Sequence, residues 1–132
     1  MAKGFGDYQK EYPGSSPRVR FLKKRIEEEG TKDPEDLMLI ILSVLKEEVL
    51  LPEVGNFYTF IYNPKTPNIS YDQHPLIACT EIQRWGFKGI NFHWRESRNY
   101  TWEEVAGKLH VVKRNELDEL LSIPYAKIRL NK

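Results

Sequence analysis

The sequence predicts an α+β fold in which two helices precede a small antiparallel SH3-like β-barrel or half-barrel. Apolar residues recur at helical spacings between residues 17 and 51. Three segments rich in aromatic and β-branched residues then follow one another without an intervening helix. Because helices and strands occur in separate runs, the strands are expected to pair antiparallel, and a late C-terminal strand is expected to close the sheet.

Composition limits the classes of protein to which the chain can belong. Its 132 residues include 40% hydrophobic and 30% charged side chains, which suits one domain with a hydrophobic core. The net charge is only +1, unlike the clear basic excess of most nucleic-acid-binding domains. The single Cys79 excludes an intramolecular disulfide. The longest aliphatic run, residues 37–42, is far shorter than the roughly 20 residues that span a membrane, so no membrane partner is expected.

Residues 1–16 are expected to form an extended N-terminal arm. Glycine and proline interrupt any periodic pattern there, yet Phe5, Tyr8 and Tyr12 are spaced along the segment. Such a segment cannot build a core of its own, so we expect these aromatic side chains to bind another protein subunit. The alternative is that the arm folds back over the β core of its own chain.

Residues 17–51 are predicted to form a helical segment of two helices. The first begins after the N-cap Ser16, with Pro17 in its first position, and ends at Gly30. Its basic side chains lie near its start and three glutamates at its end, which opposes the arrangement that the helix dipole favours. Contacts with other elements must therefore hold it in place. Its basic side chains are expected to meet an acidic partner surface; these are Arg18, Arg20, Lys23 and Lys24.

The second helix has the stronger start signal, Asp33 followed by Pro34, and Pro52 is expected to close it. One of its faces is continuously apolar and carries Leu37, Ile40, Ile41, Val44 and Leu45. Met38 and Leu42 add apolar surface elsewhere on the helix. Either this helix is covered on two sides within the chain, or one side binds another chain, and we assign Met38 and Leu42 to partner binding.

Residues 52–132 are predicted to form the β core with short helices. Strands are expected at 56–62, 76–84 and 89–95, the last with Ile90, Phe92 and Trp94 on one face. A capping box at residues 101–104 predicts a short helix that reaches about residue 109. Another short helix is expected from residue 115 to 121, and alternation in residues 125–130 predicts the final strand.

One group of residues has the chemistry of a reactive site. Asp72 and His74 lie two positions apart before the second strand, and His93 falls in the third, so the three could form a metal or nuclease site. Alternatively, Asp72 and His74 organise a turn before Pro75 through local hydrogen bonds. The sequence contains no glycine-rich phosphate loop and no serine nucleophile elbow. We therefore predict no enzymatic activity, no cofactor and no metal.

Nucleic-acid binding is the alternative function. Small β-barrels bind single strands through exposed aromatic rings beside lysine and arginine. The chain has such residues around its second and third predicted strands, namely Arg84, Trp85, Lys88, Arg95 and Arg98. The other interpretation is that the aromatic rings at this turn cap the end of the barrel.

Three segments resemble a module of small proteins encoded by tailed bacteriophages, including T4-like myoviruses. They are residues 57–66 (FYTFIYNPKT), 71–76 (YDQHPL) and 89–94 (GINFHW), within about 40 of the 132 residues. This chain departs from the pattern at Asn63, where the module usually has Asp, and at Trp94-Arg95, where it often has Tyr-Leu.

The resemblance implies a setting rather than a mechanism. It suggests a non-catalytic structural or adaptor subunit of a virion, in the tail, baseplate or neck, assembled in the host cytoplasm. Its partners would be other virion proteins and further copies of itself. A phage nucleic-acid-binding accessory protein is the competing interpretation, and no catalytic residue follows from the resemblance.

Overall fold

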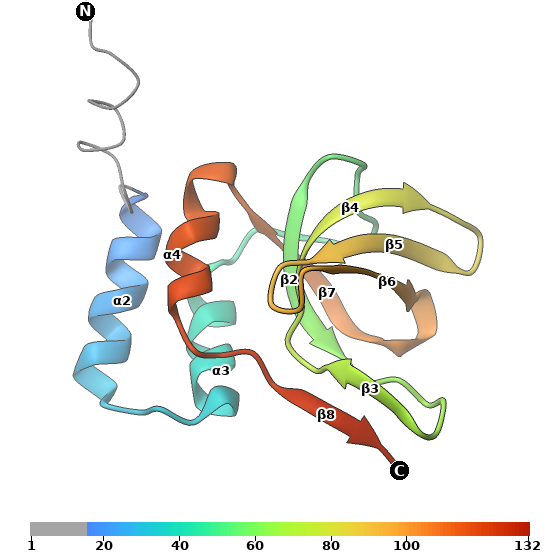
Figure 1. Ribbon diagram of the computed structural model, residues 1–132. Helices are drawn as coiled ribbons and strands as arrows, with labels where there is room; N and C mark the ends of the chain where they lie inside the picture. The colour runs from blue at the N-terminus through green and yellow to red at the C-terminus, as the bar shows by residue number, and fades with distance from the viewer. Residues whose placement is uncertain (1–15) are drawn as a thin grey trace, which may run out of the picture.

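The computed structural model describes residues 16–132, so the predictions for Phe5, Tyr8 and Tyr12 lie outside the described residues. Within this range three α-helices gather on one side of a curved antiparallel sheet, and a separate two-stranded ribbon lies below the sheet (Figure 1). The predicted α+β class is confirmed. No helix within residues 16–132 is long and apolar enough to cross a membrane.

The first helix, α2 (Pro17–Glu29), has the boundaries that its sequence predicts. The hydroxyl of Ser16 accepts a hydrogen bond from the backbone N–H of Val19 at 3.5 Å. Gly30 ends the helix in the left-handed conformation, with φ 69°, which glycine adopts without a steric penalty. Val19 and Leu22 are buried and face the rest of the chain.

The second helix, α3 (Pro34–Val44), starts where predicted but ends well before Pro52. The following residues leave the helix because Glu48 and Val49 form the short strand β1 (Glu48–Val49), which pairs with a distant strand. Met38 is fully buried in the core, so its assignment to partner binding is wrong. Leu42 is partly buried against the same core, while its neighbour Leu39 is exposed.

The main sheet has six antiparallel strands in the order β1-β7-β2-β4-β5-β6. Its further strands are β2 (Phe57–Tyr62), β4 (Leu76–Ile82), β5 (Gly86–Asn91), β6 (Glu96–Thr101) and β7 (Val105–Val112). β1 and β6 are its edges, so the sheet is open and does not close into a barrel. The predicted closure by the C-terminal strand is wrong, because β8 (Ile128–Asn131) pairs with β3 (Ile69–Asp72) in the separate ribbon.

The two faces of the sheet belong to different cores. One face carries Leu76 and Val112, which pack on the helices. These include the short helix α4 (Leu117–Ser122). The other curves around an aromatic cluster made of Tyr58, Phe60, Tyr62, Phe87 and Tyr100. The ring centroids of Phe60 and Tyr100 are 5.3 Å apart in an edge-to-face arrangement, and those of Tyr62 and Tyr100 are 4.9 Å apart. The curved sheet thus encloses a second core by itself, without another sheet or helix of the described residues packed over it.

The predicted helix from residue 101 to 109 is wrong. A single 3-10 turn, η1 (Trp102–Glu104), takes its place and leads directly into β7. Gly107 has a φ of 86°, which a right-handed helix cannot contain, and β7 gains its hydrogen bonds from β2 along most of its length. Pairing between distant strands, and not the local capping signal, therefore determines the structure of this segment.

The predicted strand at 89–95 is shifted toward the C-terminus, since β5 begins at Gly86. β5 ends at Asn91, and a tight turn that includes Arg95 in the left-handed region, with φ 61°, leads into β6. The side chain of Asn91 is buried and accepts hydrogen bonds from the backbone N–H groups of His93 and Trp94 at 2.8 and 3.0 Å. This side-chain bonding forms the turn, and Ile90 is exposed instead of facing a core.

Gly86 allows a close approach between β5 and β6. A Cβ atom at residue 86 would overlap the carbonyl oxygen of Tyr100 and lie 2.7 Å from Thr101 Cα. We expect Gly86→Ala to lower the free energy of unfolding by about 1–3 kcal/mol, because backbone must move to admit the methyl group. Urea denaturation measures this, with Ser97→Ala at an exposed position of β6 as the control. Equal stability of both variants would contradict the close approach.

Candidate functional site

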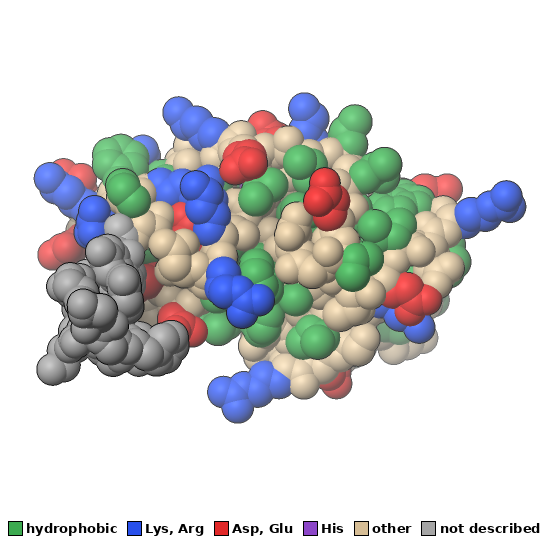
Figure 2. Space-filling view, turned by 90° about the horizontal axis from the view of Figure 1, so that it is seen from above, with side chains coloured by type: hydrophobic (Ala, Val, Ile, Leu, Met, Phe, Trp, Pro, Cys, Tyr) green, Lys and Arg blue, Asp and Glu red, His purple; other side chains and the backbone are tan. Residues whose placement is uncertain are grey.

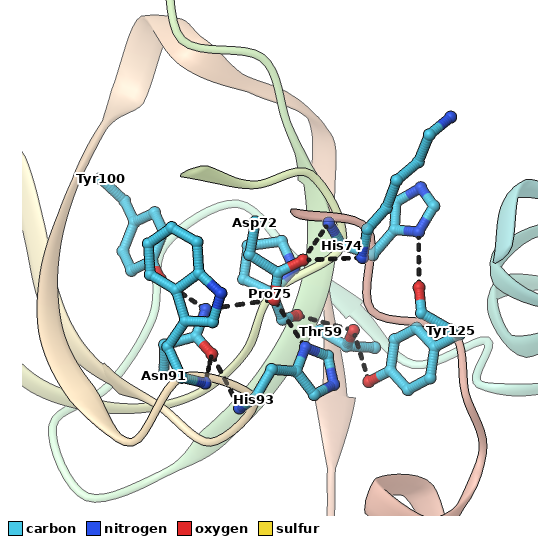
Figure 3. A network of polar contacts seen from close by, with 10 residues as sticks. Thr59, Asp72, His74, Pro75, Asn91, His93, Tyr100 and Tyr125 are labelled. Carbon is cyan, nitrogen blue, oxygen red and sulfur yellow. Dashed lines mark hydrogen bonds and ion pairs between the residues drawn. The ribbon is translucent and has the colours of Figure 1, made fainter. Parts of the chain in front are cut away.

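A buried polar network lies where the end of β3, the start of β4, the turn after β5 and the segment before β8 meet (Figure 3). Asp72 is at its centre. One of its carboxylate oxygens accepts hydrogen bonds from His93 Nδ1 at 2.5 Å and from Asn91 Nδ2 at 3.2 Å. The other accepts from the backbone N–H groups of His74 at 3.0 Å and Lys127 at 3.2 Å. One carboxylate thus joins three chain segments, around residues 72–74, 91–93 and 127.

His93 is held between Asp72 and Tyr125. Its Nδ1–H donates to Asp72, and its ring meets that of Tyr125 edge to face, with centroids 5.0 Å apart. Its Nε2 is buried and has no hydrogen-bond partner among residues 16–132. The hydroxyl of Tyr125 lies 3.2 Å from that of Thr59, which donates to the Pro75 carbonyl at 2.8 Å.

His74 connects the sheet to the helices. It is fully buried, with Nδ1 at 2.8 Å from the carbonyl oxygen of Tyr125 and Nε2 at 2.6 Å from a carboxylate oxygen of Glu35 in α3. Both ring nitrogens therefore contact oxygen atoms of residues remote in the sequence. The second Glu35 oxygen accepts from Lys127 Nζ at 2.8 Å.

The network favours ionised carboxylates. The Lys127 hydrogen bond, with the charge and hydrogen bond of His74, outweighs desolvation and lowers the pKa of Glu35. Burial opposes ionisation of Asp72, but the hydrogen bonds and charge that His93, the His74 N–H and Asn91 supply outweigh it. The pKa of Asp72 is therefore held below its usual value of 3.8. The buried charge of Asp72 and the partly exposed charge of Glu35 are thus each matched by neighbouring donors.

The structure thus brings together the three residues proposed for a metal or nuclease site, but Asp72 accepts from His93 Nδ1 and the His74 N–H, and the His74 ring bonds Glu35 and Tyr125. No group of three or more histidine, cysteine or acidic residues within residues 16–132 is arranged to hold a metal ion. The other interpretation is confirmed: the Asp72 side chain bonds the His74 N–H and shapes the turn before Pro75. We assign the network a structural role.

A second buried charge fixes the start of α2. Glu116, fully buried, accepts hydrogen bonds from Arg18 Nε and Nη2 at 2.7 Å each, from Ser16 Oγ at 2.6 Å and from the Lys113 N–H at 2.8 Å. Lys23 forms an ion pair with Glu119. Arg18 and Lys23, expected to bind a partner, thus hold α2 against the segment that contains α4.

The most exposed apolar side chains lie between β1 and β2. Leu50, Leu51 and Val54 are 75%, 65% and 59% exposed. Leu50 and Leu51 border a groove at the open side of the aromatic cluster, the Leu50–Leu51 groove, which is also lined by Phe87, Trp102, Val105 and Leu109. Figure 2 shows hydrophobic side chains gathered over the sheet on the face seen from above. The sequence prediction missed this surface, because it assigned residues 50 and 51 to the end of a buried helix.

Trp102 gives the groove a fixed wall. Its ring centroid is 5.4 Å from that of Phe87, and its Nε1–H donates to the carbonyl oxygen of Arg84 at 2.8 Å. Trp85, which follows Arg84, is 43% exposed. The groove is therefore an apolar surface with one wall fixed by these Trp102 contacts, and exposed apolar surface is typical of protein-binding sites.

The residues proposed for nucleic-acid binding do not form one surface. Arg84 and Trp85 lie in the turn before β5, and Arg95 lies in the turn after it. Lys88 and Gly89 are adjacent in β5, and Arg98 pairs with Gly89, so Lys88 and Arg98 point to opposite faces of the sheet. Arg98 also bonds Glu96 at 2.8 Å and lies over the Trp94 ring, 4.4 Å from its centroid.

Comparisons with protein-family models, with curated proteins and with solved structures find no match to this chain.

Proposed function

We propose that this protein is a non-catalytic structural or adaptor subunit that acts through contacts with other protein chains. The observation that carries the proposal is the exposed apolar surface formed by Leu50, Leu51 and Val54 beside the Leu50–Leu51 groove. Full burial of a leucine side chain contributes roughly 1.5–3 kcal/mol, and a cluster of exposed aliphatic residues marks an interaction site. The partner surface is expected to present apolar side chains that enter the groove.

The helical side of the molecule supports a second contact. Arg20 and Lys24 are exposed on α2, and Leu39 is exposed on α3, near the partly buried Leu42. The proposed role of the N-terminal arm, through Phe5, Tyr8 and Tyr12, adds to this surface. An adaptor needs two separate contact regions, and the groove lies on the sheet while α2 lies on the far side of the helices (Figure 1).

The proposed setting is a tailed-bacteriophage particle, in its tail, baseplate or neck, with assembly in the host cytoplasm. It rests on the resemblance of residues 57–66, 71–76 and 89–94 to phage proteins. We also propose that the main sheet corresponds to an SH3-like half-barrel, and its curvature around the aromatic cluster supports this relation.

We expect Leu50→Ser with Leu51→Ser to abolish incorporation of the protein into particles while its melting temperature changes by only a few degrees, because both side chains are largely exposed. Mass spectrometry of particles purified from cells that express the tagged variant measures incorporation. The matched control is Ile128→Ser with Leu130→Ser, two β8 residues that are each 50% exposed.

The control variant is expected to enter particles like the unsubstituted protein. Equal incorporation of both variants would exclude the groove as the contact, and absence of the unsubstituted protein from particles would exclude the proposed setting. DNA or RNA binding that falls steeply with salt and is lost in Arg84→Ala with Lys88→Ala would favour the nucleic-acid alternative.

A further inference from the structure

The outward face of α2 carries one unbroken stripe of exposed residues. Arg20, Phe21, Lys24, Glu27 and Glu28 are exposed, at spacings of three and four that place them on one side of a helix. The buried residues of α2 lie opposite. Figure 1 shows α2 at the edge of the molecule, farthest from the sheet, so no other described element covers this stripe. Phe21 is 54% exposed within it.

The stripe is divided by charge along the helix axis. Its N-terminal half carries Arg20 and Lys24, and its C-terminal half carries Glu27 and Glu28. The first turn of α2 contains no acidic residue and the last turn no basic one, so the charges oppose the dipole of the helix. An isolated helix would be more stable with the opposite order.

The four charged residues of the stripe form no ion pair or side-chain hydrogen bond with other residues of the described chain. Among the ion pairs and side-chain hydrogen bonds within residues 16–132, Arg18 and Lys23 bind Glu116 and Glu119, and Arg25 lies 3.8 Å from Glu29. No such contact within that part of the chain includes Arg20, Lys24, Glu27 or Glu28. The four charges face outward, with the basic residues before the acidic ones, and so are available to a partner of complementary charge.

We infer that α2 binds α2 of a second copy of this chain, antiparallel, in a two-fold symmetric dimer. In such a contact, a residue i of the first copy meets a residue j of the second, and residue j of the first copy meets residue i of the second. Every pairing therefore occurs twice. The basic half of each stripe then faces the acidic half of the other, and the two helix dipoles run in opposite directions. Phe21 of each copy lies within the basic half, between Arg20 and Lys24, and supplies apolar surface there.

The same charge order argues against other partners. An acidic protein surface or a nucleic acid would attract Arg20 and Lys24 but repel Glu27 and Glu28, and a basic surface would do the reverse. A second α2 stripe in the opposite direction places Arg20 of each copy near Glu27 and Glu28 of the other, so that the basic end of each stripe meets an acidic end. Because the charges are exposed, the association is expected to weaken as salt rises and the screening length falls from about 30 Å at 0.01 M to about 10 Å at 0.1 M.

Charge reversal tests the pairing directly. Arg20→Glu with Lys24→Glu makes the stripe entirely acidic, and Glu27→Lys with Glu28→Lys makes it entirely basic. We expect each variant of the full chain to dimerise at least about tenfold more weakly than the unsubstituted protein in sedimentation equilibrium at low salt. An equimolar mixture of the two variants should form a heterodimer, and one chain with all four substitutions should dimerise again.

The matched control is Lys108→Glu with Lys132→Glu, which changes the net charge as Arg20→Glu with Lys24→Glu does but at exposed positions outside α2. Its dimerisation should equal that of the unsubstituted chain. An unsubstituted chain that stays monomeric at low salt and high concentration would overturn the proposal. So would a dimer that the reversals leave intact, or a mixture of the two variants that stays monomeric. The Leu50→Ser, Leu51→Ser variant should still dimerise, so failure of this inference and failure of the proposed function are separately visible.

Discussion

Replacing Asp72 with alanine is expected to lower the free energy of unfolding by about 3–5 kcal/mol, because it removes a buried carboxylate and leaves several donors unsatisfied, at about 1–3 kcal/mol each. The substitution leaves the His93 ring and the N–H groups of His74 and Lys127 without their acceptor inside the fold. Urea denaturation monitored by tryptophan fluorescence measures the change. Asp118→Ala, at an exposed aspartate of α4, is the control and is expected to stay within about 0.5 kcal/mol.

The Asp72 contribution also has a defined pH dependence. Its pKa in the folded chain lies below the ordinary value of 3.8, so the unfolded chain takes up the proton first as pH falls. The stabilisation is therefore fully present above the unfolded pKa and is lost as pH falls through the lower, folded pKa. Asp72→Asn should show a shallower loss of stability below about pH 4 than the unsubstituted chain. Identical acid profiles would show that this carboxylate is not ionised in the folded chain.

Glu116→Ala is expected to have a similar effect, about 3–5 kcal/mol, because it leaves the half-buried Arg18 guanidinium and the Ser16 hydroxyl without their acceptor. Since these contacts join α2 to the segment that contains α4, the N-terminal helix should also become more accessible to protease. Thermal unfolding with limited proteolysis measures both effects. Arg25→Ala, which removes an exposed α2 arginine, is the control.

A double substitution separates the ion pair from its surroundings. Arg18→Leu with Glu116→Leu removes both charges and leaves apolar side chains, and such exchanges are often neutral. We therefore expect the double variant to be more stable than Glu116→Ala. Burial opposes ionisation of Glu116, but hydrogen bonds from Arg18, Ser16 and Lys113 outweigh it and lower its pKa. The double variant should consequently lose less stability in acid than the unsubstituted chain. A double variant as unstable as Glu116→Ala would contradict this account.

The parts of the fold that could be predicted from the sequence are those that neighbouring residues determine. Ser16, Pro17 and Gly30 fix the ends of α2 through their own backbone preferences and hydrogen bonds, and both ends were predicted correctly. The turn organised by Asp72 was predicted for the same reason. In contrast, residues 105–112 pair with β2 nearly fifty residues away, and no local pattern indicates a partner at that distance.

For the candidate sites too, features set by neighbouring residues could be predicted, and those set by distant residues could not. Asp72, His74 and His93 were chosen from the sequence for their chemistry, but Glu35, Tyr125 and Lys127, which determine what these residues do, come from remote segments. Met38 was misassigned because a helix that is apolar on several sides can be covered by its own chain or by another. The groove beside Leu50 and Leu51 depends on how the sheet curves, which no spacing of residues encodes.

The position of Tyr125, Lys127 and β8 has a consequence for folding during synthesis. These residues leave the ribosome after every other element described here, yet the Asp72 carboxylate needs the Lys127 N–H, His74 needs the Tyr125 carbonyl, and β3 needs β8. A nascent chain that already contains all six strands of the main sheet therefore still lacks one donor to the Asp72 carboxylate and one acceptor for the His74 ring. Because such remote contacts form slowly, the pairing of β3 with β8 is a late step in folding, and β3 stays an unpaired strand until β8 has been synthesised.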